Sequence, residues 1–581
     1  ARREGSLTWG VVRRFIRLNK PREPKTGAER VRVLWRAPLF WPIVLLCLGL
    51  GAVIPVLLIV LRRFTTFDYY GYPFLLWPAY ANVTELASPE WAGQWGMAFV
   101  VLLSWAWSAF FAEELLFRGV LLPRMSAVFA KRDWVANALL YALYHLHQYW
   151  MIPFRLIEGL ILARQTRRFS SYWMTVAIRS VEGLGVLTLV GLGVTSQPLT
   201  ALPAPEELPY IGRRPAPSAL YRGPMAAIPA YDPSGGSSVD LRGADLSALD
   251  LRDAFDDLAF ADFDTRTAWP PADRMPVGYD PATVLDLGKN PGLGVHTLHS
   301  QGITGRGVGV AIIDQPLLTE HSEYAARLRW YEEIPGSFAS PAQMHGPAVA
   351  SLAVGLTVGV APEADLYYIG GAGSSLQSVL LYSHDFAQGI RRILQINEQL
   401  PTERKIRAIS ISNGWQPWIA GYQDVVAAVR EAEAAGMLVL DVETGSGLPS
   451  HGLSGLGRPL LADPDAFESY GPGLFWAVRF CTPDFRPDGL LLAPMDSRTV
   501  ASAAGRDDYE FGRTGGMSWV PPYLAGLYAL AAQADPTITP DRFWSAALQT
   551  GRTIQVESDG CRGSLGTIID PVGLVDALRT R

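Results

Sequence analysis

Four long uncharged stretches in the N-terminal third of this chain limit what it can fold into. The first runs from Leu39 to Leu61 and has 23 residues, and a helix that crosses a bilayer needs about 20 apolar residues. The others are Trp95–Ala112, Trp134–Phe154 and Gly183–Pro203. One such stretch alone could be a buried core helix. Four together predict an all-α, multi-pass membrane domain over residues 1–195.

Basic segments between these stretches set the expected orientation. Arg and Lys are dense in the N-terminal segment, in the loop 118–132 and in the turn 164–168. Because short basic loops stay in the cytoplasm, placing all three there requires five crossings, one of them the shorter apolar piece Leu156–Ala163. We therefore expect a protein of the cell membrane, with the lipid bilayer as a partner and the later residues on the outer face. A further crossing at Tyr69–Val83 would reverse that side.

The overall composition excludes several classes of protein. Hydrophobic residues make up 49% of the chain, which excludes a disordered polypeptide. The net charge is -5, so we expect no nucleic-acid partner held by bulk positive charge. The three cysteines, Cys47, Cys481 and Cys561, are too few for a disulfide scaffold and contain no Cys-x-x-Cys pair.

The composition changes after the membrane domain. Residues 196–238 contain nine prolines and end in Ser-Gly-Gly-Ser-Ser, which is typical of an extended linker. In residues 239–289 an Asp-Leu pair recurs every five positions, at 240, 245 and 250. This resembles a few pentapeptide repeats, which stack as a square β-helix, but the run is too short to be stable alone. An acidic adaptor packed on the following domain is the favoured interpretation.

Three polar residues in the C-terminal half stand where α/β proteins build their sites. The apolar run 308–313 predicts a central parallel strand, with Asp314 at its carboxyl end. His345 and Ser518 each precede a helix of small residues. Singly, the Asp would be a turn residue or a cap, and the Ser an N-cap. The order Asp, His, Ser, each at a junction between a strand and a helix, predicts a catalytic triad.

These motifs resemble the conserved blocks of the subtilisin-like serine proteases, the subtilases. Asp314-Gln315-Pro316 looks like the family's Asp-Thr-Gly block. His345–Ser351 looks like its His-Gly-Thr-His-Val-Ala-Gly block, and Gly516–Pro522 like its Gly-Thr-Ser-Met-Ala-x-Pro block. The resemblance covers about residues 290–578, within a domain that we place at 290–581. It implies an α/β subtilisin-like domain with a parallel sheet, a peptide or protein substrate, and no cofactor.

The resemblance also implies a role for each residue. Ser518 would be the nucleophile, His345 the general base, and Asp314 the group that orients the imidazole. The residues that would pair with the substrate backbone as an added strand are Ser412, Asn413 and Gly414.

One departure from the family concerns the oxyanion hole. Subtilases usually supply an Asn from an Ala-Gly-Asn-x-Gly segment, and the equivalent stretch here, residues 441–447, contains no Asn. Thr444 or Ser446 could donate instead, or the backbone alone could serve. A catalytically degenerate peptide-binding scaffold is the alternative that this departure leaves open.

A second group of ionisable residues lies in the predicted membrane helices. Glu113, Glu114 and Arg118 form a Glu-Glu-x-x-x-Arg motif, and Tyr141-x-x-x-His145 follows in the next helix. Ionisable side chains at membrane depth are candidates for function. The two motifs resemble those of the CPBP family of intramembrane proteases, which includes the CAAX prenyl endopeptidases, with Tyr in place of Phe. The alternative is a buried salt bridge between Glu114 and Arg118, one helical turn apart.

The third motif of that family, His-x-x-x-Asn, is not matched. Arg179 stands where the His is expected and Gly183 where the Asn is expected. A metal site would combine His145 with Glu113 or Glu114, and zinc is the divalent ion that we expect there. A Glu/His-dependent intramembrane (CAAX-type) protease, with the soluble domain as its substrate-binding module, is therefore a rival to the serine endopeptidase.

Overall fold

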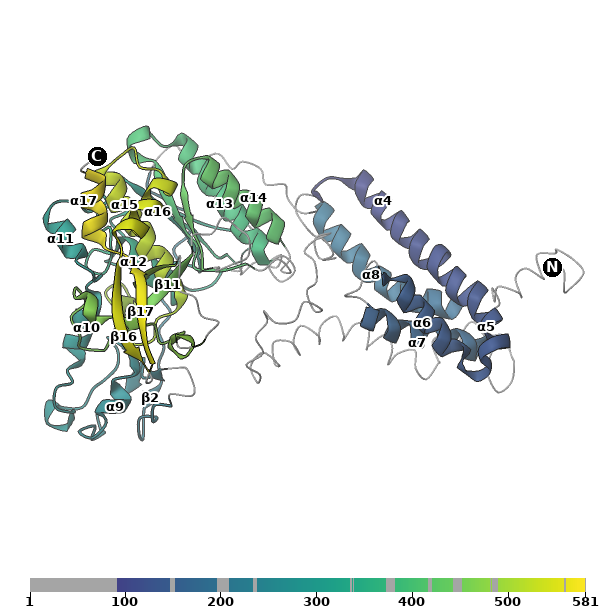
Figure 1. Cartoon of the computed structure of the whole chain (residues 1–581), viewed down its shortest axis with the longest axis horizontal. Coiled ribbons are helices and arrows are strands. Elements are labelled where there is room, and N and C mark those ends of the chain that lie inside the picture. Colours follow the sequence, from purple (N-terminus) through teal and green to yellow (C-terminus); the bar gives the residue numbers. More distant parts are fainter. Residues whose placement is uncertain are drawn as a thin grey trace, which may run out of the picture. The chain divides into compact units, whose positions relative to one another are not determined.

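The computed structural model describes two compact parts of the chain, which divide between Leu199 and Thr200 (Figure 1). We call them the helical unit and the sheet unit and describe each by itself. The described residues are 91–146, 152–195, 208–232, 238–334, 337, 339–372, 382–415, 421–442, 452–480, 482, 490–558 and 561–579. The predicted crossing at Leu39–Leu61 and the predicted oxyanion donors Thr444 and Ser446 lie outside them.

The helical unit consists of consecutive helices, of which α6 packs along α7 and α7 along α8. Their bounds are α4 Trp95–Ala106, η6 (of π geometry) Trp107–Leu121, α5 Leu122–Phe129, η7 Ala130–Arg132, α6 Asp133–Tyr144, α7 Ile152–Phe169 and α8 Trp173–Thr195. Among the helices that the structure describes, α8 alone is long and apolar enough to cross a membrane, and α4 is apolar but has 12 residues. The multi-pass topology therefore stays a prediction.

The sheet unit is built on a six-stranded parallel sheet in the order β1-β7-β8-β6-β9-β10. The strands are β1 Tyr210–Ile211, β6 Gly309–Asp314, β7 Leu328–Glu333, β8 Asp365–Gly370, β9 Ile406–Ser410 and β10 Leu438–Leu440. β6 confirms the predicted central strand, and all six of its residues are buried. Such a strand needs helices on both faces of the sheet.

Two pairs of helices cover the sheet (Figure 1). α12 (His345–Val354) packs on α15 (Val520–Ala534), and α13 (Tyr382–Gln399) packs on α14 (Tyr422–Ala434). α12 lies against β6 and β8, and α15 against β6, β9 and β10. Because the strands are parallel, their carboxyl ends form one edge of the sheet, and Asp314 stands there opposite Gly370 of β8.

Two further groups of elements complete the C-terminal half. A second sheet has the order β12-β11-β13-β17-β16. Its strands are β11 Leu453–Gly457, β12 Gly471–Pro472, β13 Leu491–Pro494, β16 Arg552–Ser558 and β17 Cys561–Ile568. The remaining helices of eight or more residues there, or just before it, are α10 Pro281–Lys289, α16 Pro540–Thr550 and α17 Pro571–Arg579.

The acidic segment 239–289 shares a sheet with much later residues, in the order β14-β15-β5-β3. The strands are β3 Val239–Asp240, β5 Ala261–Asp264, β14 Arg498–Ala501 and β15 Tyr509–Gly512, while β2 Gly223–Pro224 pairs with β4 Ala244–Asp245. Phe263 of β5 stands opposite Phe511 of β15. Phe511 and Leu460 belong to the hydrophobic cluster of this segment, so its core is completed by the domain that follows.

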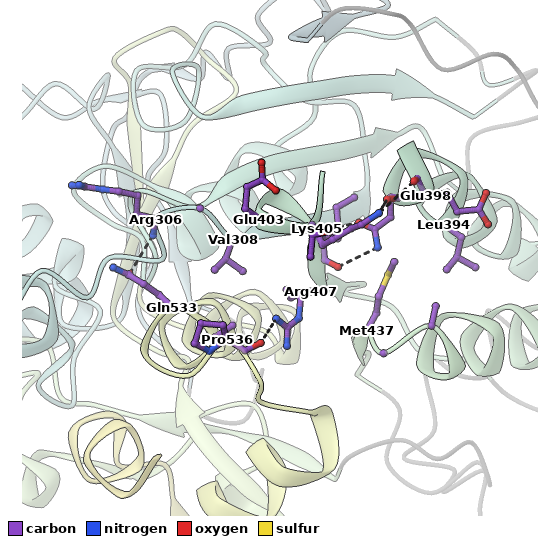
Figure 2. A pocket seen from close by; sticks show the side chains of 17 residues that line it. Arg306, Val308, Leu394, Glu398, Glu403, Lys405, Arg407, Met437, Gln533 and Pro536 are labelled. Carbon is purple, nitrogen blue, oxygen red and sulfur yellow. Dashed lines mark hydrogen bonds between the residues drawn. The ribbon is translucent and has the colours of Figure 1, made fainter. Parts of the chain in front are cut away.

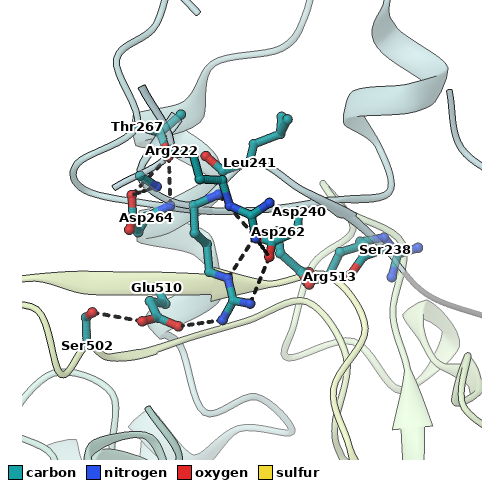
Figure 3. Close-up of polar contacts among 12 residues, drawn as sticks. Arg222, Ser238, Asp240, Leu241, Asp262, Asp264, Thr267, Ser502, Glu510 and Arg513 are labelled. Carbon is teal, nitrogen blue, oxygen red and sulfur yellow. Dashed lines mark hydrogen bonds and ion pairs between the residues drawn. The ribbon is translucent and has the colours of Figure 1, made fainter. Parts of the chain in front are cut away.

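A polar cluster reinforces that contact (Figure 3). Arg242 Nε donates to Asp240 Oδ1 at 2.9 Å, and Arg242 Nη1 donates to Glu510 Oε2 at 3.2 Å. The other oxygen of Glu510 accepts from Ser502 Oγ at 2.9 Å. Both oxygens of Glu510 on β15 are thus engaged, one of them by the acidic segment.

Candidate active site

Asp314 and His345 meet at the carboxyl edge of the parallel sheet. His345 Nδ1 donates to Asp314 Oδ1 at 2.7 Å. The same oxygen accepts the backbone N–H of Gln315 at 2.7 Å. The Asp314 side chain is 6% exposed and the His345 side chain 20% exposed. A carboxylate that holds the proton on Nδ1 leaves the lone pair on Nε2, which is the atom a general base uses.

A close approach of two chain segments makes this contact geometrically possible. Gly346 follows His345 at the start of α12, and a Cβ at Gly346 would lie 2.7 Å from the carbonyl oxygen of Gln315. Any side chain there would push α12 away from the loop after Asp314. The Gly that follows His345 is therefore required by the close packing of the start of α12 on the loop after Asp314.

Ser518 lies in the short helical turn Met517–Trp519, directly before α15. Ser412 Oγ donates to the backbone carbonyl of Ser518 at 2.7 Å, which ties the turn to the segment after β9. Ser518 Oγ donates to the Ser412 carbonyl at 3.5 Å, and no hydrogen bond to His345 is formed within the residues that the structure describes. Catalytic hydrogen bonds of this kind commonly tighten only when substrate is bound.

The residues expected to pair with substrate lie beside this turn. Ser412, Asn413 and Gly414 are half-buried and follow β9. The carbonyl of Asn413 accepts the backbone N–H of Val442 at 3.2 Å. The segment that would supply the oxyanion donor therefore starts next to the expected substrate strand.

The pKa of His345 reflects two opposed influences. Burial lowers it, and the charge and hydrogen bond of Asp314 raise it, so that the pKa lies above the ordinary value for histidine. The ring of Trp519 lies next to the imidazole, with centroids 5.6 Å apart. Trp519 was not singled out by the sequence motifs, because its neighbour in the fold comes from a helix 174 positions earlier in the chain.

A cavity of about 900 Å³ lies at the opposite end of the parallel sheet, around the first residues of β6, β9 and β10 (Figure 2). Arg306, one of its cationic side chains, pairs with the carboxylate of Glu363 at 2.8 Å, and the other two are engaged by backbone carbonyls. Lys405 Nζ donates to Glu398 at 3.3 Å, and Arg407 Nη1 donates to Pro536 at 3.1 Å. Because the cavity is a full strand length from Asp314, we assign it no part in the chemistry.

In the helical unit, the residues of the two membrane motifs form an ion-pair network. Arg118 Nε lies 3.4 Å from Glu114 Oε2, and both side chains are fully buried. His145 Nε2 lies 3.8 Å from Glu113 Oε1, too far for a hydrogen bond. His145 Nδ1 donates to the carbonyl of Tyr141 at 2.9 Å. The structure thus gathers Glu113, Arg118 and His145 around Tyr141, and Glu114 joins them through Arg118.

Arg179 of α8 lies in the middle of this network. Its guanidinium is 3.2 Å from Glu113 Oε2, 3.4 Å from Glu114 Oε1 and 3.1 Å from Glu158 Oε1. Arg155 pairs with Glu158 at 2.8 Å. The three carboxylates therefore face the guanidinium groups of three arginines. The sequence motifs do not predict that Glu158 and Arg155 belong to the network, because both lie on α7, outside the two motifs.

These residues do not fit a metal ion. No group of three or more His, Cys, Asp or Glu side chains that could hold a metal occurs among the described residues. Glu113 and Glu114, the expected ligands, both face the guanidinium of Arg179. A divalent cation there would have to displace a buried positive charge, so the predicted zinc site has no support.

Removal of Arg179 should destabilise the helical unit strongly. Arg179→Ala leaves three carboxylates close together without their shared cation, and breaking a buried ion network in this way costs about 3–5 kcal/mol. We expect a correspondingly lower midpoint when helix content of the detergent-solubilised full chain is followed through denaturant. Arg168→Ala, at an exposed position on α7, is the matched control. Equal midpoints for Arg179→Ala and wild type would contradict the network.

Two protein families match this chain. Residues 305–440 match the subtilase family. Residues 95–182 match the family described as type II CAAX prenyl endopeptidase Rce1-like.

Individual relatives match parts of the chain. The subtilisin-like protease PopC of Myxococcus xanthus is 40% identical over 85 residues, which are 13% of this chain and 18% of PopC. The serine protease AprX of Bacillus subtilis is 25% identical over 276 residues, 42% of this chain and 61% of AprX. The chain thus spans less than two thirds of either relative. Among solved structures, the prenylagaramide maturation protease PagA is similar at 16% identity and a TM-score of 0.34, over 49% of this chain and 98% of PagA.

Proposed function

Because this chain carries a subtilase domain and an Rce1-like CAAX protease domain, we propose that it is a membrane-associated serine endopeptidase that cleaves peptides or proteins at the membrane. The observation that carries the proposal is the 2.7 Å hydrogen bond from His345 Nδ1 to Asp314 Oδ1, close to the turn that holds Ser518. The family implies a peptide or protein as the substrate class.

In the proposed mechanism Ser518 Oγ attacks the carbonyl carbon of the scissile peptide bond. His345 Nε2 takes the hydroxyl proton during the attack and then gives it to the leaving amine, so that an acyl-enzyme remains. Water repeats the sequence, with His345 again as the base, and releases the acid product. Asp314 keeps the imidazole in the required tautomer and stabilises it when it becomes charged.

The tetrahedral oxyanion has to be stabilised without the usual Asn. The 15-residue helix α15 begins at Val520, two residues after Ser518, and its first turn contains Pro521 and Pro522. Because proline has no backbone N–H, the helix contributes mainly its dipole, which favours a developing negative charge at the N-terminus. Thr444 and Ser446 remain our proposed side-chain donors. The loss of one donor typically costs about 10²–10³ in kcat, so we expect a slow enzyme.

The helical unit holds the protease at the membrane in this proposal. α8 is long and apolar enough to span a bilayer, and exposed side chains of α4, such as Trp95 and Phe99, are large and apolar. We keep the multi-pass arrangement in the cell membrane and the outer-face location of the sheet unit as parts of the proposal. We assign no hydrolysis to the helical unit, because Arg179 engages both glutamates of its motif.

Covalent labelling tests the serine mechanism directly. A fluorophosphonate probe should label the wild-type full chain, and Ser518→Ala should abolish the labelling while circular dichroism stays unchanged. Peptide cleavage should survive a chelator and disappear after labelling. Label that persists in Ser518→Ala, or cleavage by a folded wild type that the probe does not block, would reject Ser518 as the nucleophile. Cleavage lost in Glu113→Gln but kept in Ser518→Ala would favour the intramembrane alternative.

A further inference from the structure

Two carboxylates hold the chain segment that leads from β15 to Ser518. The backbone N–H of Arg513 donates to Asp262 Oδ1 at 2.7 Å. Two residues further on, the backbone N–H of Gly515 donates to Asp496 Oδ1 at 2.8 Å. Asp262 belongs to β5 in the acidic segment, whereas Asp496 follows β13. The segment before the candidate nucleophile is therefore held from two distant parts of the chain.

Asp496 is a buried carboxylate that serves only backbone groups. It is 1% exposed, its second oxygen accepts the N–H of Leu474 at 2.7 Å, and it forms no ion pair within the described ranges. Burying a carboxylate that has no direct ion pair is costly, although the nearby charge of Arg513 attracts it, and an apolar side chain would suffice for packing alone. What the carboxylate adds is two acceptor oxygens, one for each backbone N–H. Burial raises the pKa of Asp496 to about 7.

The approach of the two segments depends on Gly515. A Cβ at Gly515 would lie 2.1 Å from the carbonyl oxygen of Met495. Only a residue without a side chain lets the N–H of position 515 reach Asp496. The carboxylate and the glycine therefore act together to fix the path of the chain three residues before Ser518.

Arg513 is anchored to the acidic segment twice. Besides the backbone bond to Asp262, its Nε donates to the carbonyl of Ala259 at 2.8 Å. Asp262 in turn accepts from the hydroxyl of Ser238 through its other oxygen. β5 and β15 are also paired strands, at Asp264 with Glu510 and at Phe263 with Phe511. The acidic segment thus contacts β15 and Arg513 through strand pairing, a bond to the Arg513 backbone and a bond from the Arg513 side chain.

We propose that Asp262 and Asp496 are positioning residues that hold the Arg513–Gly515 segment so that Ser518 stands in its reactive place. The inference rests on the proposed serine mechanism. It makes the acidic segment a working part of the protease rather than a removable leader. A displacement of about 1 Å at the reacting atom costs up to about 10²-fold in rate, so two bonds close to the nucleophile can control kcat without touching substrate.

The two positions predict opposite responses to the same substitution. At position 262, Asn keeps one oxygen for the Arg513 N–H and presents an amide to Ser238, whose hydroxyl can accept. At position 496 both oxygens accept backbone N–H groups, so the amide of Asn would face a donor. Asp262→Asn should therefore be tolerated, whereas Asp496→Asn and Asp262→Ala should not.

The test compares these variants in the full chain at pH 8, where Asp496 is ionised. We expect Asp262→Ala and Asp496→Asn to lose about 10- to 100-fold in kcat and in the fluorophosphonate labelling rate, with KM nearly unchanged. Asp262→Asn should stay near wild type. Asp250→Asn is the matched control, since Asp250 lies in the same segment, is 51% exposed and pairs with Arg252. Assays are run well below the unfolding temperature of each variant.

Hydrogen exchange of residues 509–518 tests the positioning role of Asp262 and Asp496 separately from the serine mechanism. Faster exchange of the Gly515 amide in Asp496→Asn, but not in Asp262→Asn, supports the holding of the segment by Asp496. If wild type is then neither labelled nor active, the proposed serine mechanism fails while the hold on the segment stands. If Asp262→Ala melts earlier but keeps the wild-type kcat and labelling rate, the carboxylates only stabilise the fold and the proposal is wrong. Equal behaviour of the two Asn variants would also overturn it. If Asp496→Asn does not fold, the Asp262→Ala and Asp262→Asn pair decides alone.

Discussion

Replacing Ser518 with Ala is expected to lower kcat for peptide cleavage by roughly 10⁶-fold, and His345→Ala by a similar factor. The attack needs the hydroxyl and its base at once, so the loss of either removes the whole nucleophilic step. The double variant should therefore be no slower than either single one. What remains is the rate that substrate binding and the oxyanion site provide by themselves.

The measurement is kcat with a peptide ester or amide, on chains purified side by side. Ser300→Ala at the end of α11 (Val295–Ser300) is a suitable control, because the exposed hydroxyl of Ser300 donates to the carbonyl of Thr297, its one hydrogen bond within the described residues. A double variant slower by the product of the two single losses would mean that Ser518 and His345 act independently, which a triad excludes.

The second large effect concerns Asp314. Asp314→Asn is expected to cost about 10⁴-fold in kcat, although the side chain keeps its size. An amide can donate to His345 Nδ1 and so favour the tautomer with its proton on Nε2, which cannot accept the proton of Ser518. Asp365→Asn is the control, since Asp365 stands at the amino end of β8 and accepts from Arg329 Nε at 2.7 Å.

The pH profile gives an independent readout of the same contact. Neutral His345 is the base, so kcat/KM should rise with pH through its pKa. Burial lowers that pKa and Asp314 raises it to a net value above that of ordinary histidine. In Asp314→Asn the lowering by burial remains and the raising by charge is gone. The residual activity should then rise at lower pH than in wild type, and an unmoved profile would contradict the pairing.

The strand and helix junctions of the sheet unit were predictable because their signals are local. An apolar run of strand length ending in Asp314 indicates a buried parallel strand, and β6 runs from Gly309 to Asp314. Small residues after His345 predict a helix that packs closely, and α12 is buried along its length. These patterns need no knowledge of any distant residue.

Contacts between distant residues were not predictable in the same way. Arg179 lies 66 positions from Glu113, and only the packing of α8 on η6 brings their charges to 3.2 Å. Asp262 and Arg513 are 251 positions apart, and the acceptor of that bond pairs with a backbone N–H that every residue except proline has. Because the donor is a backbone group, no particular residue type in the sequence marks the position of the contact.

The pairing of β5 with β15 also sets a condition on how the chain matures. β5 is made first, and its partner follows about 250 residues later, which at typical synthesis rates is a delay of roughly 12 to 50 s. During that time Phe263 lacks its contact with Phe511 and the edge of β5 that pairs with β15 is open, and such edges attract other strands. Long sequence separation also slows folding. This chain should therefore depend on chaperones while it is being made and refold slowly after denaturation.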